Sequence, residues 1–366
     1  MIRPYHLMPL LLAVAAAGPM PTGATQAQPV PETAAATPDA IAEAYAALLE
    51  RDYVYPDIGR RYAEALRAGI KAGRYQALAG EDLAEALTAD VNAVSPDGHL
   101  RVRPPEAAPR ADAPASNRPP RKEPVEQAGW IAPGIAFVRF NVFPMDADVT
   151  AAAAKFMTDH ADAKAIIFDI RTHNGGGLDQ MDVIFPWLFA KPTRLVTMAT
   201  RASVDAQGGS PIDGLASMRK VAGDPGMVTR EHWATPNADT RLRDAKIYVL
   251  TSGATASAAE HFSLAMKHTG RGVLVGDPTA GANHFGGGQD LGGGFGAFIP
   301  VGRTYDPVTG KDWEGDGVQP DIAVPPAGAL ERALVELGVE AGEAKRLGDA
   351  HMPSWPMERR KPRGVG

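Results

Sequence analysis

One serine, Ser257, stands where an apolar strand should turn into a helix. The run Ala245–Leu250 is apolar and β-prone, and Ala258–Met266 carries small, charged and apolar residues at helical spacing. Ser257 is therefore expected at a helix N-terminus, where free backbone N–H groups and the helix dipole stabilise negative charge on a substrate oxygen. Acyl transfer requires such stabilisation. The same residues, Ser257 to Glu260, also have the form of a capping box, in which the serine only caps the helix.

A glycine triplet, Gly175–Gly177, follows another strand-like run, Ala165–Ile170. Glycine backbone can approach a ligand closely and present N–H groups to it, although the simplest interpretation of such a triplet is a tight turn. The triplet and the start of the serine helix should converge at the carboxyl edge of one sheet. The backbone N–H groups of Gly176 and Ala258 are therefore the expected oxyanion hole.

The elements that position these residues fall into two parts. Residues 39–103 have apolar side chains at three- and four-residue spacing, which predicts a bundle of three short helices ending in the turn Ser95–His99. Residues 104–123 are rich in proline, alanine and arginine and predict a linker. Residues 124–326 alternate strand-like and helix-like segments, which predicts an α/β core with a largely parallel sheet.

The sequence also predicts the individual strands and helices of the α/β core. Strands are expected at Gly134–Phe140, Ala165–Ile170, Ala245–Leu250, Gly272–Val275 and Gly296–Val301, and helices at Val149–His160, Leu178–Phe189 and Ser257–Lys267. Residues 200–240 lack a clear period and predict an irregular insertion, and 286–294 predict a glycine-rich loop. Residues 327–366 predict one helix, at 327–338, and a tail.

Composition limits the function classes. The chain has 366 residues, 45% hydrophobic and 22% charged, as in an ordinary globular protein. Residues 1–27 have the pattern of an export signal and 28–38 of a flexible leader, so a periplasmic or secreted protein is expected. Nothing later in the chain is apolar enough to predict a membrane helix. The net charge of −6 argues against nucleic acid as a partner, and zero cysteines exclude disulfides and thiolate metal sites.

Four motifs in this order resemble the C-terminal processing peptidase family of serine hydrolases, which includes the tricorn core and retinoid-binding repeats. They are Asp169–Gly177, Thr255–Glu260, Gly276–Ala282 and Trp313–Ile322, and the turn Asp97–His99 resembles the end of the family's amino-terminal module. The resemblance implies a crotonase-like α/β core, with the nucleophile at Ser257. It also implies a peptide substrate and no cofactor or metal.

The sequence departs from the family's best-known branch, which uses a serine–lysine dyad, because Ala282 stands at the lysine position. The tricorn-like branch pairs serine with a histidine and a glutamate, and those positions hold His99 and Glu314 here. The resemblance therefore implies a Ser257–His99–Glu314 triad, in which the imidazole activates the hydroxyl and the carboxylate orients the imidazole. Only the 104–123 linker occupies the place of a PDZ module, so short peptides are the expected substrates.

Several alternatives stay open at this stage. Other histidines, at 173, 261, 268 and 284, are alternative bases or ordinary surface residues, and a zinc site on His261 and His268 lacks identifiable partners. Trp313 is expected to be a packing residue. The chain could instead be a noncatalytic binder of retinoid- or fatty-acid-like ligands, or a scaffold that keeps the motifs for folding. The sequence does not predict the oligomeric state.

Overall fold

The computed structural model describes residues 36–106, 121–210 and 212–359. The export-signal prediction for 1–27, most of the leader at 28–38, most of the linker at 104–123 and the last seven residues of the tail fall outside these residues.

Three helices form the amino-terminal bundle: α1 (Pro38–Asp52), α2 (Pro56–Lys71) and α3 (Gly80–Val94). Helix α1 begins after Thr37, whose hydroxyl accepts a hydrogen bond from the Ala40 amide at 3.2 Å. Apolar side chains from all three helices, among them Tyr45, Leu66 and Leu87, are fully buried. They share one hydrophobic cluster with residues of two strands, β10 (Phe285–Gly292) and β11 (Phe295–Tyr305). The bundle therefore packs directly on part of the α/β core.

The central sheet has the strand order β12-β9-β8-β4-β3-β2. Its strands are β2 (Val125–Ala132), β3 (Ile135–Phe140), β4 (Ala165–Asp169), β8 (Lys246–Thr251), β9 (Val273–Gly276) and β12 (Ile322–Ala323). All neighbours pair in parallel except β2 with β3. The strands β3 and β4 are buried along their whole length, as expected of a sheet covered on both faces.

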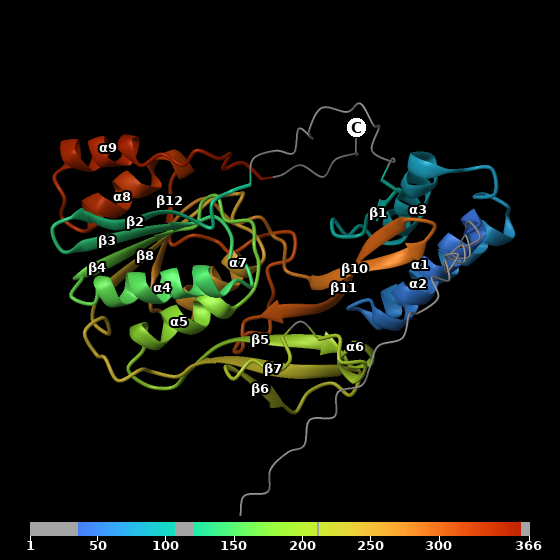
Figure 1. Cartoon of the computed structure of the whole chain (residues 1–366), viewed down its shortest axis with the longest axis horizontal. Coiled ribbons are helices and arrows are strands. Elements are labelled where there is room, and N and C mark those ends of the chain that lie inside the picture. The colour runs from blue at the N-terminus through green and yellow to red at the C-terminus, as the bar shows by residue number, and fades with distance from the viewer. Residues whose placement is uncertain (1–35, 107–120, 211, 360–366) are drawn as a thin grey trace, which may run out of the picture. The chain divides into compact units, whose positions relative to one another are not determined.

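Helices cover both faces of this sheet (Figure 1). On one side lie α4 (Ala147–Asp159), α5 (Asp179–Leu188) and α7 (Ala258–His268), whose side chains share a core with the sheet. On the other lie α8 (Ala329–Glu336), preceded by the 3-10 turn Pro326–Gly328, and α9 (Ala341–Ala350). Helix α9 falls in the segment that the sequence predicted as tail.

A second, antiparallel sheet was not predicted. Its order is β1-β11-β5-β7-β6, and β10 also pairs with β11. The remaining strands are β1 (Val102–Arg103), β5 (Thr193–Arg201), β6 (Met218–Val221) and β7 (Met227–Ala234), with the short helix α6 (Ala202–Ala206) between β5 and β6. The expected largely parallel arrangement therefore applies to the central sheet alone.

Two sequence predictions inside this second sheet were wrong. The supposed irregular insertion at 200–240 contains β6, β7 and the end of β5; its strand pattern is obscured because polar side chains such as Arg230 and His232 are buried. The supposed loop at 286–294 is mostly strand β10. Its glycines allow close approach of two strands, because a Cβ on Gly286 would lie 1.9 Å from the carbonyl oxygen of Ile299.

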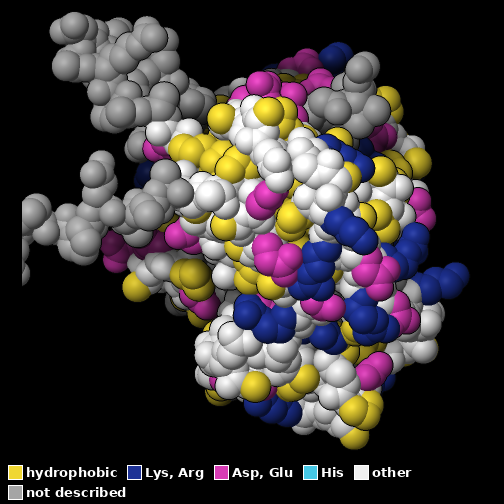
Figure 2. Space-filling model, turned by 90° about the vertical axis from the view of Figure 1, so that its right-hand side faces the viewer, with side chains coloured by type: hydrophobic (Ala, Val, Ile, Leu, Met, Phe, Trp, Pro, Cys, Tyr) yellow, Lys and Arg dark blue, Asp and Glu magenta, His cyan; other side chains and the backbone are white. Residues whose placement is uncertain are grey.

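The surface is mixed in charge on the face shown in Figure 2, where basic and acidic side chains intersperse. Ion pairs on the bundle account for part of this pattern, for example Arg67 with Glu43 and Glu50. No helix of the described ranges has both the length and the apolar character needed to cross a bilayer.

Candidate active site

Ser257 lies in a sharp turn between β8 and α7. Its φ of 55° and ψ of −117° make it the only residue other than glycine with positive φ among the residues described. An ordinary N-cap residue has extended backbone angles, so this conformation is more strained than capping requires. Strain of this kind is typical of nucleophile elbows, which expose a serine hydroxyl between a strand and a helix.

The capping-box prediction is nevertheless correct for Glu260. Its buried carboxylate accepts a hydrogen bond from the Ser257 amide at 2.8 Å. It also accepts from the amides of Gly281 and Ala282 at 2.7 and 2.9 Å and from the Thr279 hydroxyl at 2.6 Å. Burial raises the pKa of Glu260, and these hydrogen bonds only partly oppose that effect. Glu260 therefore fixes the serine turn to the segment 279–282.

The glycine loop lies against the serine. A Cβ on Gly175 would lie 2.9 Å from the Ser257 Cβ and 3.3 Å from its Oγ. The Ala256 amide donates to the carbonyl of His173 at 2.9 Å, which ties the serine turn to the end of β4. A Cβ on Gly176, where φ is 132°, would lie 2.0 Å from the Phe143 carbonyl oxygen. Only glycine fits this position without moving the backbone.

Two backbone amides beside the serine are available to a ligand. In the glycine loop, the amide of Gly175 donates to the His173 ring and that of Gly177 to the Phe143 carbonyl. The Gly176 amide makes no hydrogen bond to a described residue. The same holds for the Ala258 amide at the first turn of α7. These are the two amides that the sequence predicted for an oxyanion hole.

His99 is held by a turn that joins α3 to β1. The Asp97 carboxylate accepts from the His99 backbone amide at 2.8 Å and lies 3.0 Å from the His99 Nδ1 atom. The strand β1 that follows pairs with β11, with Val102 opposite Ala297. The turn at the end of the bundle thus places the His99 imidazole beside the α/β core and is held by its own hydrogen bonds.

Glu314 approaches the same imidazole from the loop after β11. Its Oε1 lies 3.6 Å from the His99 Nδ1, while its Oε2 accepts hydrogen bonds from the amides of Asn283 and His284 at 2.7 and 3.1 Å. The structure therefore brings together His99 and Glu314, which stand 215 residues apart in the sequence. Asp97, which the sequence analysis left out of the site, lies closer to the imidazole than Glu314.

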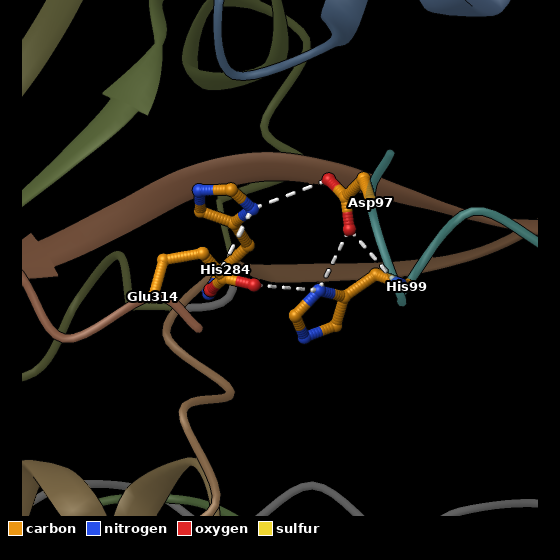
Figure 3. A group of neighbouring side chains, drawn as sticks. All are labelled: Asp97, His99, His284 and Glu314. Carbon is orange, nitrogen blue, oxygen red and sulfur yellow. Dashed lines mark hydrogen bonds and ion pairs between the residues drawn. The ribbon is translucent and has the colours of Figure 1, made fainter. Parts of the chain in front are cut away.

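His284 completes the group of four side chains shown in Figure 3, where dashed lines join Asp97 to both imidazoles. The His284 Nδ1 is 3.3 Å from Asp97 and 3.8 Å from Glu314, and its Nε2 is 3.4 Å from the Tyr55 hydroxyl. Both ring nitrogens of His284 thus have partners. In contrast, the second ring nitrogen of His99 points away from both carboxylates (Figure 3). His99 is therefore the better placed of the two as a base.

The charged side chains of this group shift the pKa values of one another. Burial on its own would lower the pKa of His99, but the hydrogen bond to Asp97 and the charges of Asp97, Glu314 and Glu260 raise it. For Asp97, burial would raise the pKa, but the hydrogen bonds from His284 and His99 hold it far below its usual range. Asp97 is therefore a carboxylate at neutral pH.

The described residues show no hydrogen bond between the His99 ring and the Ser257 hydroxyl. A continuous set of contacts nevertheless connects them. Glu260 binds the amides of Ser257 and Ala282, and the next two amides in the chain, those of Asn283 and His284, bind Glu314. Glu260 is also close enough for its charge to affect His99.

The other histidines considered from the sequence have partners of their own. His173 is fully buried and accepts the Gly175 amide at 3.0 Å. His261 Nε2 is 2.8 Å from His232, which in turn lies 3.0 Å from Asp182. His268 is 3.5 Å from Asp306 at the end of α7. Trp313 is buried in the core cluster, consistent with the packing role predicted for it.

A cleft of about 910 Å³ opens beside the serine turn and the glycine loop. Its lining includes Asn174, which precedes the glycine triplet, and Ala254, which lies three residues before Ser257. The rest of the lining comes from residues 121–124, from Val142, Pro144, Asp146 and Val149, and from Trp355, Pro356 and Glu358.

A strained serine at a helix N-terminus, a glycine loop beside it and a neighbouring cleft are features expected of hydrolases that act by acyl transfer. Comparison with known proteins narrows this class. The model of peptidase family S41 matches residues 134–324, and a model described as the N-terminal domain of peptidase S41 in eukaryotic IRBP matches residues 24–129. The chain belongs to peptidase family S41 and is a serine-type peptidase.

Solved structures share the fold. The photosystem II D1 C-terminal processing protease is 17% identical, with a TM-score of 0.55 over 85% of this chain and 97% of its own. A putative peptidase from Parabacteroides merdae is 16% identical, with a TM-score of 0.56 over 87% and 99%. A lipoprotein from Streptococcus agalactiae is 12% identical, with a TM-score of 0.50 over 82% and 96%. These likenesses and the family assignment agree with the predicted crotonase-like α/β core and amino-terminal helices.

Proposed function

We propose that this chain is an exported peptidase that cleaves short peptides through Ser257, His99 and Glu314. His99 takes the hydroxyl proton of Ser257 through Nε2, the ring nitrogen that points away from both carboxylates. The serine oxygen then attacks the peptide carbonyl. The amides of Gly176 and Ala258 stabilise the oxyanion, and His99 returns the proton to the leaving amine. Water then gives a proton to His99 and attacks the acyl carbonyl; the bond from that carbon to the Ser257 oxygen breaks, His99 returns the proton to this oxygen, and the second product leaves as a carboxylic acid.

The observation that carries this proposal is the strained serine, together with two neighbouring amides that make no hydrogen bond to a described residue. A serine that only caps α7 would need neither the positive φ nor an amide at Gly176 left without a partner in the described part of the chain. The approach of His99 and Glu314 to 3.6 Å supports the assignment of base and orienting carboxylate. The cleft lined by Asn174 and Ala254 is a suitable place for the peptide. The export pattern at 1–27 supports an extracytoplasmic location.

A fluorophosphonate probe tests the nucleophile and the base. We expect wild-type protein to become labelled at Ser257, Ser257→Ala to remain unlabelled, and His99→Ala to react at least about 100-fold more slowly. His268→Ala is a matched control, because that histidine pairs with Asp306 at the far end of α7. Labelling of folded Ser257→Ala at the same rate as wild type would contradict the proposal.

A second function is favoured by one observation, the match of residues 24–129 to a domain named from eukaryotic IRBP, a retinoid-binding protein. The alternative is a noncatalytic binder of retinoid- or fatty-acid-like ligands. Such a protein would bind retinol with a measurable change in ligand fluorescence and would leave the fluorophosphonate probe unreacted. Peptide cleavage by wild type and its loss in Ser257→Ala would reject this alternative.

A further inference from the structure

The four side chains around His99 have the composition of a metal site. Asp97, His99, His284 and Glu314 each offer one ligand atom, and these atoms all lie within 4.8 Å of one another. Two imidazoles and two carboxylates suit divalent transition metals, Zn²⁺ in particular. Two carboxylate charges would balance the charge of the cation.

The distances between these groups are close to those in a tetrahedral metal site. Bonds from Zn²⁺ to nitrogen and oxygen of about 2.0–2.2 Å place neighbouring ligand atoms of a tetrahedral site about 3.3–3.6 Å apart. Asp97 lies with Oδ1 3.0 Å from the Nδ1 of His99 and with Oδ2 3.3 Å from the Nδ1 of His284. Glu314 lies with Oε1 3.6 Å from the first Nδ1 and with Oε2 3.8 Å from the second. Since one ligand atom from each of the four residues lies within 4.8 Å of the others, side-chain rotations that turn one oxygen of each carboxylate inward would bring four atoms to bonding distance of one central ion.

Partners outside the group hold the ligands in orientation, as is usual around protein-bound zinc. The Tyr53 hydroxyl donates to Asp97 at 2.7 Å, and the Tyr55 hydroxyl lies 3.4 Å from the Nε2 of His284. Two backbone amides bind the Oε2 of Glu314. Access is also available: the side chains of Asp97 and His284 are 3% and 4% exposed, but those of His99 and Glu314 are 20% and 27% exposed.

We propose that Asp97, His99, His284 and Glu314 bind one Zn²⁺ ion, and that the bound ion switches off the peptidase. The regulatory half of this inference rests on the proposed function; the binding half does not. A neutral imidazole that binds a metal through Nδ1 carries its proton on Nε2. His99 in that state has no lone pair with which to accept the Ser257 proton. Zinc would therefore remove the general base without touching the serine.

Binding is tested on the full chain, freed of metal with EDTA and titrated with Co²⁺ as a spectroscopic substitute for Zn²⁺. We expect one equivalent of Co²⁺ to produce the intense visible absorption of a four-coordinate site, and Zn²⁺ to displace it. His284→Asn should weaken binding by about 100-fold or more, since even the loss of a partner outside the ligand set costs about 10- to 100-fold. His268→Asn should bind as wild type does.

The opposite results would overturn the binding claim. In the first such result, wild type develops no absorption with Co²⁺, and the four groups are then a hydrogen-bonded network only. In the second, folded His284→Asn binds Co²⁺ as tightly as wild type. Circular dichroism establishes that each variant is folded. If His284→Asn does not fold, Glu314→Gln replaces it, because that change removes one ligand charge at a side chain that is only 27% exposed.

Inhibition is tested by the rate of fluorophosphonate labelling at Ser257. Saturating Zn²⁺ should slow labelling of wild type by about 100-fold or more, and EDTA should restore it. In His284→Asn the ratio of rates without and with Zn²⁺ should fall toward one. Labelling that Zn²⁺ leaves unchanged, with the ion bound, would reject the switch. Stoichiometric Co²⁺ binding by a protein that never reacts with the probe would reject the proposed function and leave the metal site intact.

Discussion

We expect the stability of the fold to fall at acid pH because of His173, which lies against the glycine loop. Its ring is fully buried beneath the loop, and its Nδ1 accepts the Gly175 amide, so the ring must be neutral at that nitrogen. Burial, with a lesser effect from the charge of Lys122, lowers the pKa of His173 to about 3. Protonation would turn Nδ1 into a donor facing another donor. The folded protein therefore excludes the protonated form, whereas the unfolded chain accepts it.

The sign and size of the effect follow from this difference. The folded-state pKa lies below the ordinary value of 6.5, so the stabilisation is complete above pH 6.5 and is lost as the pH falls toward about 3. The full difference between the pKa of 6.5 and the folded-state pKa of about 3 corresponds to at most about 5 kcal/mol of unfolding free energy. Between pH 7.5 and pH 5, protonation of the unfolded imidazole alone should cost about 2 kcal/mol of unfolding free energy.

The assay is urea unfolding of wild type and His173→Asn at pH 7.5 and pH 5. The Asn side-chain oxygen can still accept the Gly175 amide, but it does not titrate. We expect wild type to lose about 2 kcal/mol more than His173→Asn between the two pH values. His261, whose pKa burial also lowers, contributes equally to both proteins.

Phe143→Leu is the control, because the Phe143 ring packs against His173 with centroids 4.2 Å apart. This variant should lower the stability at both pH values and keep the pH dependence of wild type. Equal losses in wild type and His173→Asn would refute the reasoning, since they would mean that His173 is protonated in the folded protein. A Phe143→Leu protein without the pH dependence would refute it too.

Three further predictions concern the residues that build the site. Gly176→Ala should reduce the rate of fluorophosphonate labelling by at least about 100-fold, because the new methyl group displaces the loop amide; Gly208→Ala, at a positive φ in open space, should label normally. Glu260→Gln should cost about 2–6 kcal/mol in urea unfolding, because an amide group cannot accept from all four donors that the carboxylate serves. Asp169→Asn should cost about 3–5 kcal/mol, because it leaves the buried Arg139 and Arg171 without their shared carboxylate; Asp239→Asn, at an exposed pair, should change stability little.

Local patterns predicted the elements on either side of Ser257. Apolar spacing located the three bundle helices and the strand-turn-helix around Ser257, because each of these segments buries one continuous face or its whole length. The same patterns failed in the second sheet. There β7 buries Arg230 and His232, which pair with carboxylates from other segments, so its polar residues resemble those of a loop. Strand β10 failed because its glycines serve close strand packing.

The site around His99 shows a different limit. The family resemblance named His99 and Glu314, but Asp97 looked like an ordinary turn residue and His284 like one of several spare histidines. Their importance comes from pairings across 187 residues of chain, which no local period encodes. One local signal did exist: an aspartate two residues before a histidine can accept that residue's amide and so fix the turn. The same carboxylate then also faces the imidazole, which places Asp97 nearer to His99 than the glutamate the resemblance selected. The carboxylate nearest to the His99 imidazole therefore comes from the histidine's own turn, and a local pattern could have identified it.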